Sequence, residues 1–327
     1  MSLAAVARNL HSLNLLTEAT YQEVTRLIEL GGLRSRSTLL RQVEQDAVIR
    51  LHRLLDPYAR NFRNVHIAVD DFTDEMRSEF LQIGHQLKES GVLSDRVHEQ
   101  LKAEIVAGHI RLHVQLFRQA AMQMEIYERL QPPQVQPFLN SLRESGVISH
   151  VGYMQLLQAL SAGTIENSIE FLNYFDRAVL FDLRDYSKDP YDYFPKIHQT
   201  IAQMLTKTGV ANITLNDFAL ETGVDIDYSD NNAIVSVSVN GRQYQQSSYY
   251  STPKDKNDFL GRIDSDEFID LFNKILRDRG SPYRLYAEEA FSYDFGIPAV
   301  DYSRFGVLAL TDNQAKVYFE QRDAYYS

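Results

Sequence analysis

The chain has 327 residues, of which 44% are apolar and 24% charged, a composition typical of a globular protein and unlike a collagen, a mucin-like stalk or a wholly disordered chain. It has no cysteine, which excludes disulfides, thiolate zinc sites, iron–sulfur clusters and cysteine nucleophiles. The net charge of −11 disfavours non-specific binding to nucleic acid or anionic lipid, and no apolar run approaches the roughly 18 residues of a membrane span. We therefore expect a cytoplasmic protein that binds neither nucleic acid nor membrane.

A diverged repeat runs through the first part of the chain. Its first signature is a Gly or Asn, two apolar residues and a Ser or Thr, and it occurs at residues 14–17, 91–94 and 146–149. A second glycine follows each copy 17 residues later, at Gly31, Gly108 and Gly163. Gly and Asn adopt the left-handed conformation that ends a helix, and Ser or Thr caps the next helix. Residues 1–185 are therefore predicted to form an all-α domain, an array of three diverged three-helix units.

The segment 186–195 carries two prolines and breaks the helical pattern, so we place a linker at 186–194. Residues 195–327 are predicted to form an α+β domain with an antiparallel sheet, which makes the protein a multidomain one. Asn240-Gly241 is the strongest hairpin signal. In chain order we expect helices at 195–208 and 264–279 and one starting at Thr311, and strands at 224–228, 233–239, 242–250, 283–288 and 305–310.

Four residues are candidate metal ligands because of their spacing. His109 and His113 stand at i and i+4, so on one helix both imidazoles would reach the same ion, and His85 and Glu89 have the same spacing on an earlier helix. This order is similar to the ligand pattern of hemerythrin-like di-iron bundles, but a whole predicted helix separates the two pairs and no later His and Asp ligands follow. The alternative is a solvated helix face, because nine histidines produce several such pairs by chance.

Three carboxylates form a second candidate metal site. Asp225 and Asp227 share one face of a predicted strand, and Asp230 follows in the turn. Together they would hold Ca²⁺ or Mg²⁺. The alternative is the wet face of an edge strand, where charge discourages association with another strand. We expect no cofactor, and a divalent metal is the alternative.

Seven arginines between residues 34 and 63 form a basic stretch. Nucleic-acid binding is one interpretation of such a stretch. Glu44, Asp46 and Asp56 are interleaved with the arginines, and the surroundings are acidic. We therefore expect a solvated face with ion pairs instead.

The chain lacks the glycine-rich phosphate loop, the dinucleotide fingerprint, the zincin motif and the serine-hydrolase motif. We therefore expect a non-catalytic module that binds an unidentified protein partner. One alternative is an inhibitor of a basic protein, because the amphipathic helix, strand and terminal helix of the second part resemble the layout of small bacterial immunity or antitoxin proteins. The other alternative is a metal-dependent enzyme or a small-ligand sensor, since residues can converge in three dimensions without a motif.

Overall fold

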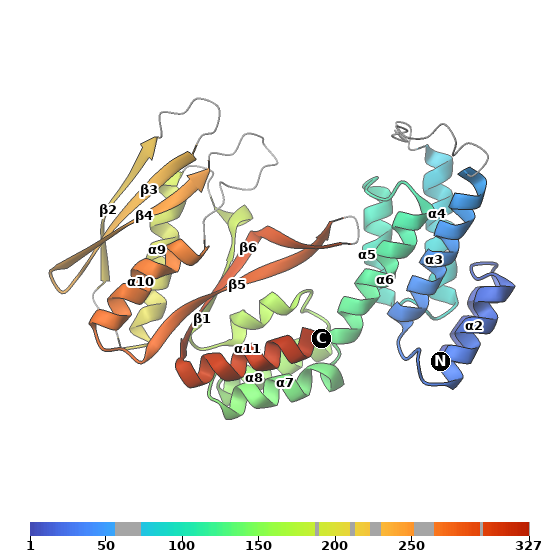
Figure 1. The fold of residues 1–327 in the computed structure, drawn as a ribbon, viewed down its shortest axis with the longest axis horizontal. Coiled ribbons are helices and arrows are strands. Elements are labelled where there is room, and N and C mark those ends of the chain that lie inside the picture. Colours follow the sequence, from blue (N-terminus) through green and yellow to red (C-terminus); the bar gives the residue numbers. More distant parts are fainter. Residues whose placement is uncertain are drawn as a thin grey trace. The chain divides into compact units, whose positions relative to one another are not determined.

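The protein forms two compact units, each with a hydrophobic core of its own. The first unit comprises Met1–Arg129 and Tyr293–Pro298, and the second comprises Leu130–Ser292 and Ala299–Ser327. The structure is a computed structural model (Figure 1). It describes residues 1–55, 73–186, 190–209, 213–222, 230–251, 265–294 and 297–326.

Within residues 1–55 and 73–129, the first unit consists of α-helices joined by short turns. Their bounds are α1 Leu3–Ser12, α2 Glu18–Glu29, α3 Arg36–Leu55, α4 Asp74–Glu89, α5 Asp95–Val106 and α6 His113–Arg129. The turns use left-handed backbone at Asn14, Gly31, Gly91 and Gly108, with φ of 58°, 69°, 81° and 77°. Thr17 and Ser94 cap α2 and α5, because each side chain accepts a hydrogen bond from the backbone N–H three residues ahead.

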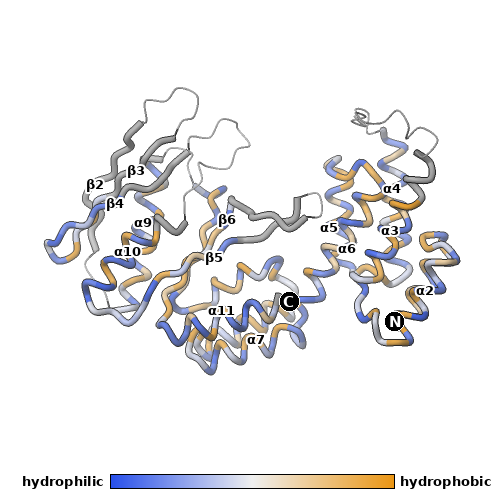
Figure 2. The backbone as a smooth tube through the Cα atoms, in the orientation of Figure 1, coloured by the Kyte–Doolittle hydropathy of each residue, from blue (hydrophilic) through white to orange (hydrophobic). Residues whose placement is uncertain are grey.

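All six of these helices contribute buried residues to one core. Apolar residues recur at helical spacing and alternate with polar ones along each helix, as Figure 2 shows. Helix α3 packs along α6. One fully buried side chain from each helix, in chain order, is Leu10, Val24, Leu39, Phe80, Leu101 and Leu116.

The second unit begins with two more helices, α7 (Pro132–Glu144) and α8 (His150–Ala162). Gly146 supplies the left-handed turn between them, and Gly163 ends α8 in the same conformation. A 3₁₀ helix, η2 (Ser168–Tyr174), follows α8. The C-terminal helix α11 (Asp312–Tyr326) packs on α7 (Figure 1).

Two antiparallel sheets complete the second unit. The first has the order β1-β6-β5, with bounds β1 Ala178–Asp182, β5 Tyr283–Asp294 and β6 Ile297–Thr311. Strand β1 pairs with β6 so that Leu180 lies opposite Gly306. A 3₁₀ turn, η3 (Leu183–Asp185), follows β1.

The second sheet is a meander of three strands with helices on one face. Its order is β2-β3-β4, with bounds β2 Ile213–Thr222, β3 Asp230–Val239 and β4 Arg242–Ser251. Asn240 and Gly241 form the tight turn between β3 and β4 with φ of 50° and 80°, which confirms the predicted hairpin. Helices α9 (Pro190–Thr206) and α10 (Ser265–Asp278) cover one face of this sheet (Figure 1).

The structure confirms a largely helical chain with antiparallel sheet in its second part, but it corrects two details. Strand β1 lies within the segment that was predicted to be all α. Its five residues are a weak signal by themselves, and the strand forms because it pairs with β6, far along the chain. The third helix of the third copy is also not an α-helix but the 3₁₀ helix η2, whose Leu172 packs against Gly306 of β6.

Two other predictions are not decided by the fold. The predicted strand at 224–228 lies outside the described residues. The division into compact units comes after Arg129, whereas the predicted linker is 186–194. The predicted domains, 1–185 and 195–327, stay a prediction, because a division by contacts does not measure independent folding.

Candidate functional site

The histidines proposed as metal ligands do not share a helix. Helix α6 begins at His113, so His109 lies in the preceding turn and the i, i+4 geometry is absent. Nδ1 of His109 lies 2.8 Å from a carboxylate oxygen of Glu104, and Nε2 of His113 lies 3.0 Å from one of Glu79. Each imidazole therefore pairs with its own carboxylate.

His85 and Glu89 do share a helix, α4, with Nε2 and Oε1 3.2 Å apart. The ring centroid of His98 lies 6.2 Å from that of His85. Within the described ranges, no three His, Asp or Glu side chains form a group that could hold a metal ion. The described residues supply no third ligand beside any pair among these four, so metal binding by them stays a prediction.

The aspartate cluster cannot be placed in the same way. Asp225 and Asp227 lie outside the described residues. Asp230 is the first residue of β3, where the sequence indicated a turn. The calcium or magnesium site at these residues stays a prediction.

Within the described part of the basic stretch, Arg41 and the interleaved Glu44 each form an ion pair with helix α6, and the part from residue 56 to 63 lies outside the described residues. Arg41 of α3 lies 2.8 Å from Glu125 of α6, and Glu44 of α3 lies 2.7 Å from Arg118 of α6. Asp46 of α3 is buried and accepts hydrogen bonds from the Thr17 N–H and from the Thr17 and Thr20 hydroxyls. These charged groups therefore join α3 to α6 and to the start of α2.

Two buried ionisable groups in the second unit are also held by packing. His198 is buried in the core, and its Nδ1 donates a hydrogen bond of 2.8 Å to the carbonyl of Phe194. Burial lowers the pKa of His198 from 6.5 to about 4, so the ring is neutral at pH 7. These contacts enclose the imidazole among core side chains.

Glu288 joins strand β5 to helix α11. Its carboxylate accepts a hydrogen bond of 3.0 Å from the guanidinium of Arg322. Burial raises the pKa of Glu288, whereas the charge of Arg322 and a hydrogen bond from Tyr318 act in the opposite direction. This pair holds the C-terminal helix against the sheet.

Helix α8 carries the surface that is most unusual in the described chain. It is the one described α-helix whose sequence contains no Asp, Glu, Lys or Arg. On its exposed side, Val151 and Met154 are 65% and 52% accessible to solvent. Of the large apolar residues that the structure shows as exposed, Val151 and Met154 are the two that lie on the same helix, about one turn apart. Single exposed apolar residues are ordinary, but a group of them marks a contact surface.

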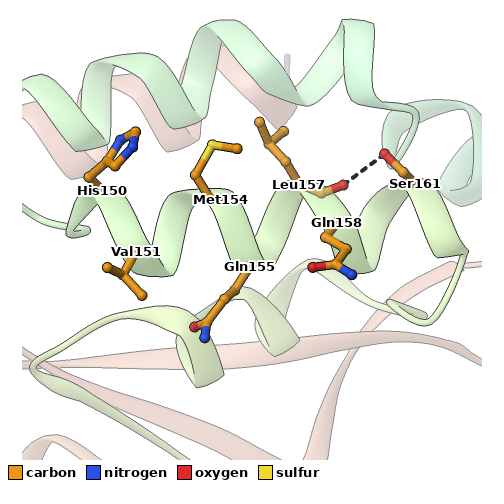
Figure 3. Close-up of a pocket in the computed structure, with 7 residues that line it drawn as sticks. All are labelled: His150, Val151, Met154, Gln155, Leu157, Gln158 and Ser161. Carbon is orange, nitrogen blue, oxygen red and sulfur yellow. Dashed lines mark hydrogen bonds between the residues drawn. The ribbon is translucent and has the colours of Figure 1, made fainter.

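A shallow hollow follows this face of α8. Its lining side chains, labelled in Figure 3, are His150, Val151, Met154, Gln155, Leu157, Gln158 and Ser161. All seven come from α8, and the Ser161 hydroxyl donates a hydrogen bond of 2.8 Å to the carbonyl of Leu157. We call this surface the α8 face. It contains no Asp, Glu, Lys or Arg, and its amides and hydroxyl can both donate and accept hydrogen bonds.

The opposite side of α8 is buried within the second unit. Tyr153, Leu156 and Leu160 are buried, and the Tyr153 hydroxyl donates to Asn140 of α7 over 2.8 Å. The Ser149 side chain caps the N-terminus of α8 by accepting a hydrogen bond from the Gly152 N–H. The α8 face is therefore presented on a helix that is capped at its start, ended by Gly163 and anchored along its length.

No catalytic or metal-binding motif of the sequence falls on this surface. The absence of charge over His150–Ala162 is visible in the sequence. Which apolar residues of that helix are exposed depends on tertiary packing, since the helix is apolar on more than one side. Only the first of these two signals could have been found without the structure.

Comparison with models of known protein families, with curated proteins and with solved structures gives no match. None of the helices within the described ranges combines the length and apolar character required to cross a lipid bilayer.

Proposed function

We propose that the protein is a non-catalytic protein-binding module that docks a partner on the α8 face. The observation that carries this proposal is the pairing of exposed Val151 and Met154 on a helix without charged side chains. Binding a partner would remove this apolar surface from water at no cost of burying an unpaired charge. Interface centres are characteristically depleted of charge and enriched in residues such as Met.

The arrangement of the ionisable groups supports binding over catalysis. His198 and Glu288, the two described groups with pKa values raised or lowered by deep burial, both serve to hold elements of the second unit together. We also propose a cytoplasmic setting and retain the interpretation of the helical part as three diverged copies of one unit. The first two copies have three α-helices each, and the third has two followed by η2.

The test is a double variant that makes the α8 face polar without changing its charge. Val151→Gln with Met154→Gln should abolish capture of a specific partner from native lysate, measured by quantitative mass spectrometry. Both residues are exposed, so the melting temperature should stay within about 2 °C of the wild type, since surface substitutions change stability by less than about 0.5 kcal/mol.

The matched control changes two exposed apolar residues of the first unit. Leu30→Gln with Val106→Gln alters side chains that are 70% and 56% exposed and lie on separate elements. This control should retain the partner. Equal capture by both double variants would show that the α8 face is not the docking surface. A melting shift of the wild type with divalent metal ions alone would favour the alternative of a metal-dependent enzyme.

A further inference from the structure

We propose, on the basis of the protein-binding function above, that the partner of the α8 face is a cationic amphipathic helix. The side of the partner helix that contacts the α8 face is an uncharged, apolar stripe about three turns long, and Lys or Arg side chains flank that stripe. Two independent features of the chain carry this inference, the absence of Asp, Glu, Lys and Arg from the α8 face and the distribution of charge between the two units.

The α8 face sets the size and the polarity of the contact stripe. Helix α8 has 13 residues and is therefore about 20 Å long at 1.5 Å per residue. Val151 and Met154 lie on it beside Gln155 and Gln158, which provide polar groups without charge. A charged side chain placed against this face would lose its hydration without gaining an ion pair, so the partner's central stripe is apolar.

The charge of the second unit determines what flanks that stripe. Residues 130–327 contain 17 Lys and Arg against 27 Asp and Glu, a net charge of −10. Residues 1–129 contain 16 Lys and Arg against 17 Asp and Glu, a net charge of −1. The α8 face thus belongs to the unit that carries almost all of the negative charge.

Exposed carboxylates also occur just beyond both ends of α8. Glu144 ends α7 six residues before α8 starts, and Glu166 follows α8 by four residues. Both residues are exposed. Complementary charge steers a partner during encounter and suppresses partners of like charge, so cationic residues at the ends of the stripe suit this surface.

A second copy of this chain fits the α8 face less well. Two second units would each bring a net charge of −10 to the contact. A helix about 20 Å long and about 10 Å wide presents a few hundred Å², an area that a single helical segment can cover, whereas a stable contact between two whole chains buries about 800 Å² on each side. One short helix of a cationic partner matches this surface in both area and charge.

The experiment uses the full-length chain and three labelled synthetic helical peptides of about 14 residues, which match the length of α8. The first peptide has Leu at positions i, i+3, i+4 and i+7 and Lys on both flanks. The second replaces each Lys with Glu, and the third keeps Lys but replaces each Leu with Gln. Fluorescence anisotropy gives the dissociation constants.

We expect the Leu/Lys peptide to bind at least about tenfold more tightly than either of the others, a difference equivalent to about 1.4 kcal/mol. Its affinity should fall when ionic strength rises from about 0.05 M to about 0.3 M, because salt screens the flanking charges. Val151→Gln with Met154→Gln should weaken binding at least about fivefold, and Leu30→Gln with Val106→Gln should leave it unchanged.

Three results would overturn the proposal, and each has a separate meaning for the function. Equal binding of the Lys and Glu peptides would remove the cationic requirement but retain the α8 face as a docking surface. Absence of binding by all peptides, with lysate capture still dependent on Val151 and Met154, would mean a partner of other chemistry. Self-association in analytical ultracentrifugation that the α8 double variant abolishes would identify a second copy as the occupant.

Discussion

At the scale of single residues, His198 shows how burial in the core changes the titration of a side chain. It lies on α9 with its ring centroid 6.2 Å from that of Phe194 and 5.6 Å from that of Phe272. The carbonyl of Phe194 accepts the Nδ1 hydrogen, and the ring is surrounded by core residues. Because burial disfavours the imidazolium, the pKa falls to about 4.

This lowered pKa predicts a loss of stability in acid. The unfolded chain takes up a proton on His198 near pH 6.5, whereas the folded chain does so only near pH 4. The effect of His198 on the free energy of unfolding is therefore absent above about pH 6.5. As the pH falls toward 4, protonation of His198 in the unfolded chain lowers the free energy of unfolding by about 3 kcal/mol in total. Chemical denaturation at pH 7 and pH 4.5 measures the decline in the free energy of unfolding.

The non-titrating control is His198→Asn, whose amide can still donate to the Phe194 carbonyl. It should be less stable than the wild type at pH 7 because it fills less of the core. It should also lose less stability than the wild type between pH 7 and pH 4.5. If the free energy of unfolding declined equally in the two proteins between pH 7 and pH 4.5, the decline would not come from protonation of His198.

At the scale of elements, α8 and η2 approach each other closely because residue 152 is a glycine. A Cβ built on Gly152 would lie 2.1 Å from the carbonyl oxygen of Tyr174, far inside ordinary contact distance. Gly306 of β6 likewise leaves room for Leu172 of η2, since a Cβ there would lie 2.0 Å from its Cδ1. The two glycines thus fix how η2 sits between α8 and the β1-β6-β5 sheet.

Gly152→Ala should therefore destabilise the second unit by about 1–3 kcal/mol, the usual cost of overpacking. The backbone carbonyl of Tyr174 cannot move aside as the end of a flexible side chain would. The matched control is Gly84→Ala in α4, where the nearest atoms to the new Cβ would be 3.9 Å away. That substitution should stabilise its helix by up to about 1 kcal/mol. Denaturant titration of both variants measures the difference, and equal effects would argue against the close approach.

At the scale of the whole molecule, the segment before the predicted linker folds together with the C-terminus. Phe138 of α7 stacks on Tyr325 of α11 with centroids 5.3 Å apart. The Gln314 amide of α11 donates to the carbonyls of Ser145 and Gly146 at the end of α7, over 3.2 Å and 2.8 Å. Strand β1 adds pairing to β6 from the same segment.

These contacts predict which fragments are stable alone. A fragment 130–327 keeps α7, α8, η2 and β1, and should unfold in one cooperative transition. A fragment 195–327 lacks all four, leaves one side of β6 unpaired and should show no cooperative melting by circular dichroism. Cooperative unfolding of 195–327 would instead support the predicted linker at 186–194.

The features that the sequence by itself determined are those in which all interacting groups lie within a few residues. The left-handed residues Asn14 and Gly108, the Asn240-Gly241 hairpin and the cap of the last helix all follow from local chemistry. At that cap, Thr311 and Gln314 exchange two hydrogen bonds between side chain and backbone, as their spacing predicts.

Tertiary structure alone decided the features that depend on partners far along the chain. Ala178–Asp182 is a strand because β6 pairs with it, and Leu172 of η2 packs against Gly306 of the same β6 strand. His109 and His113 are separated because α6 starts only at His113. The α8 face is also of this kind, since an apolar helix exposes whichever side its neighbours leave uncovered. Local propensity selects turns and caps, whereas burial selects which faces remain available for binding.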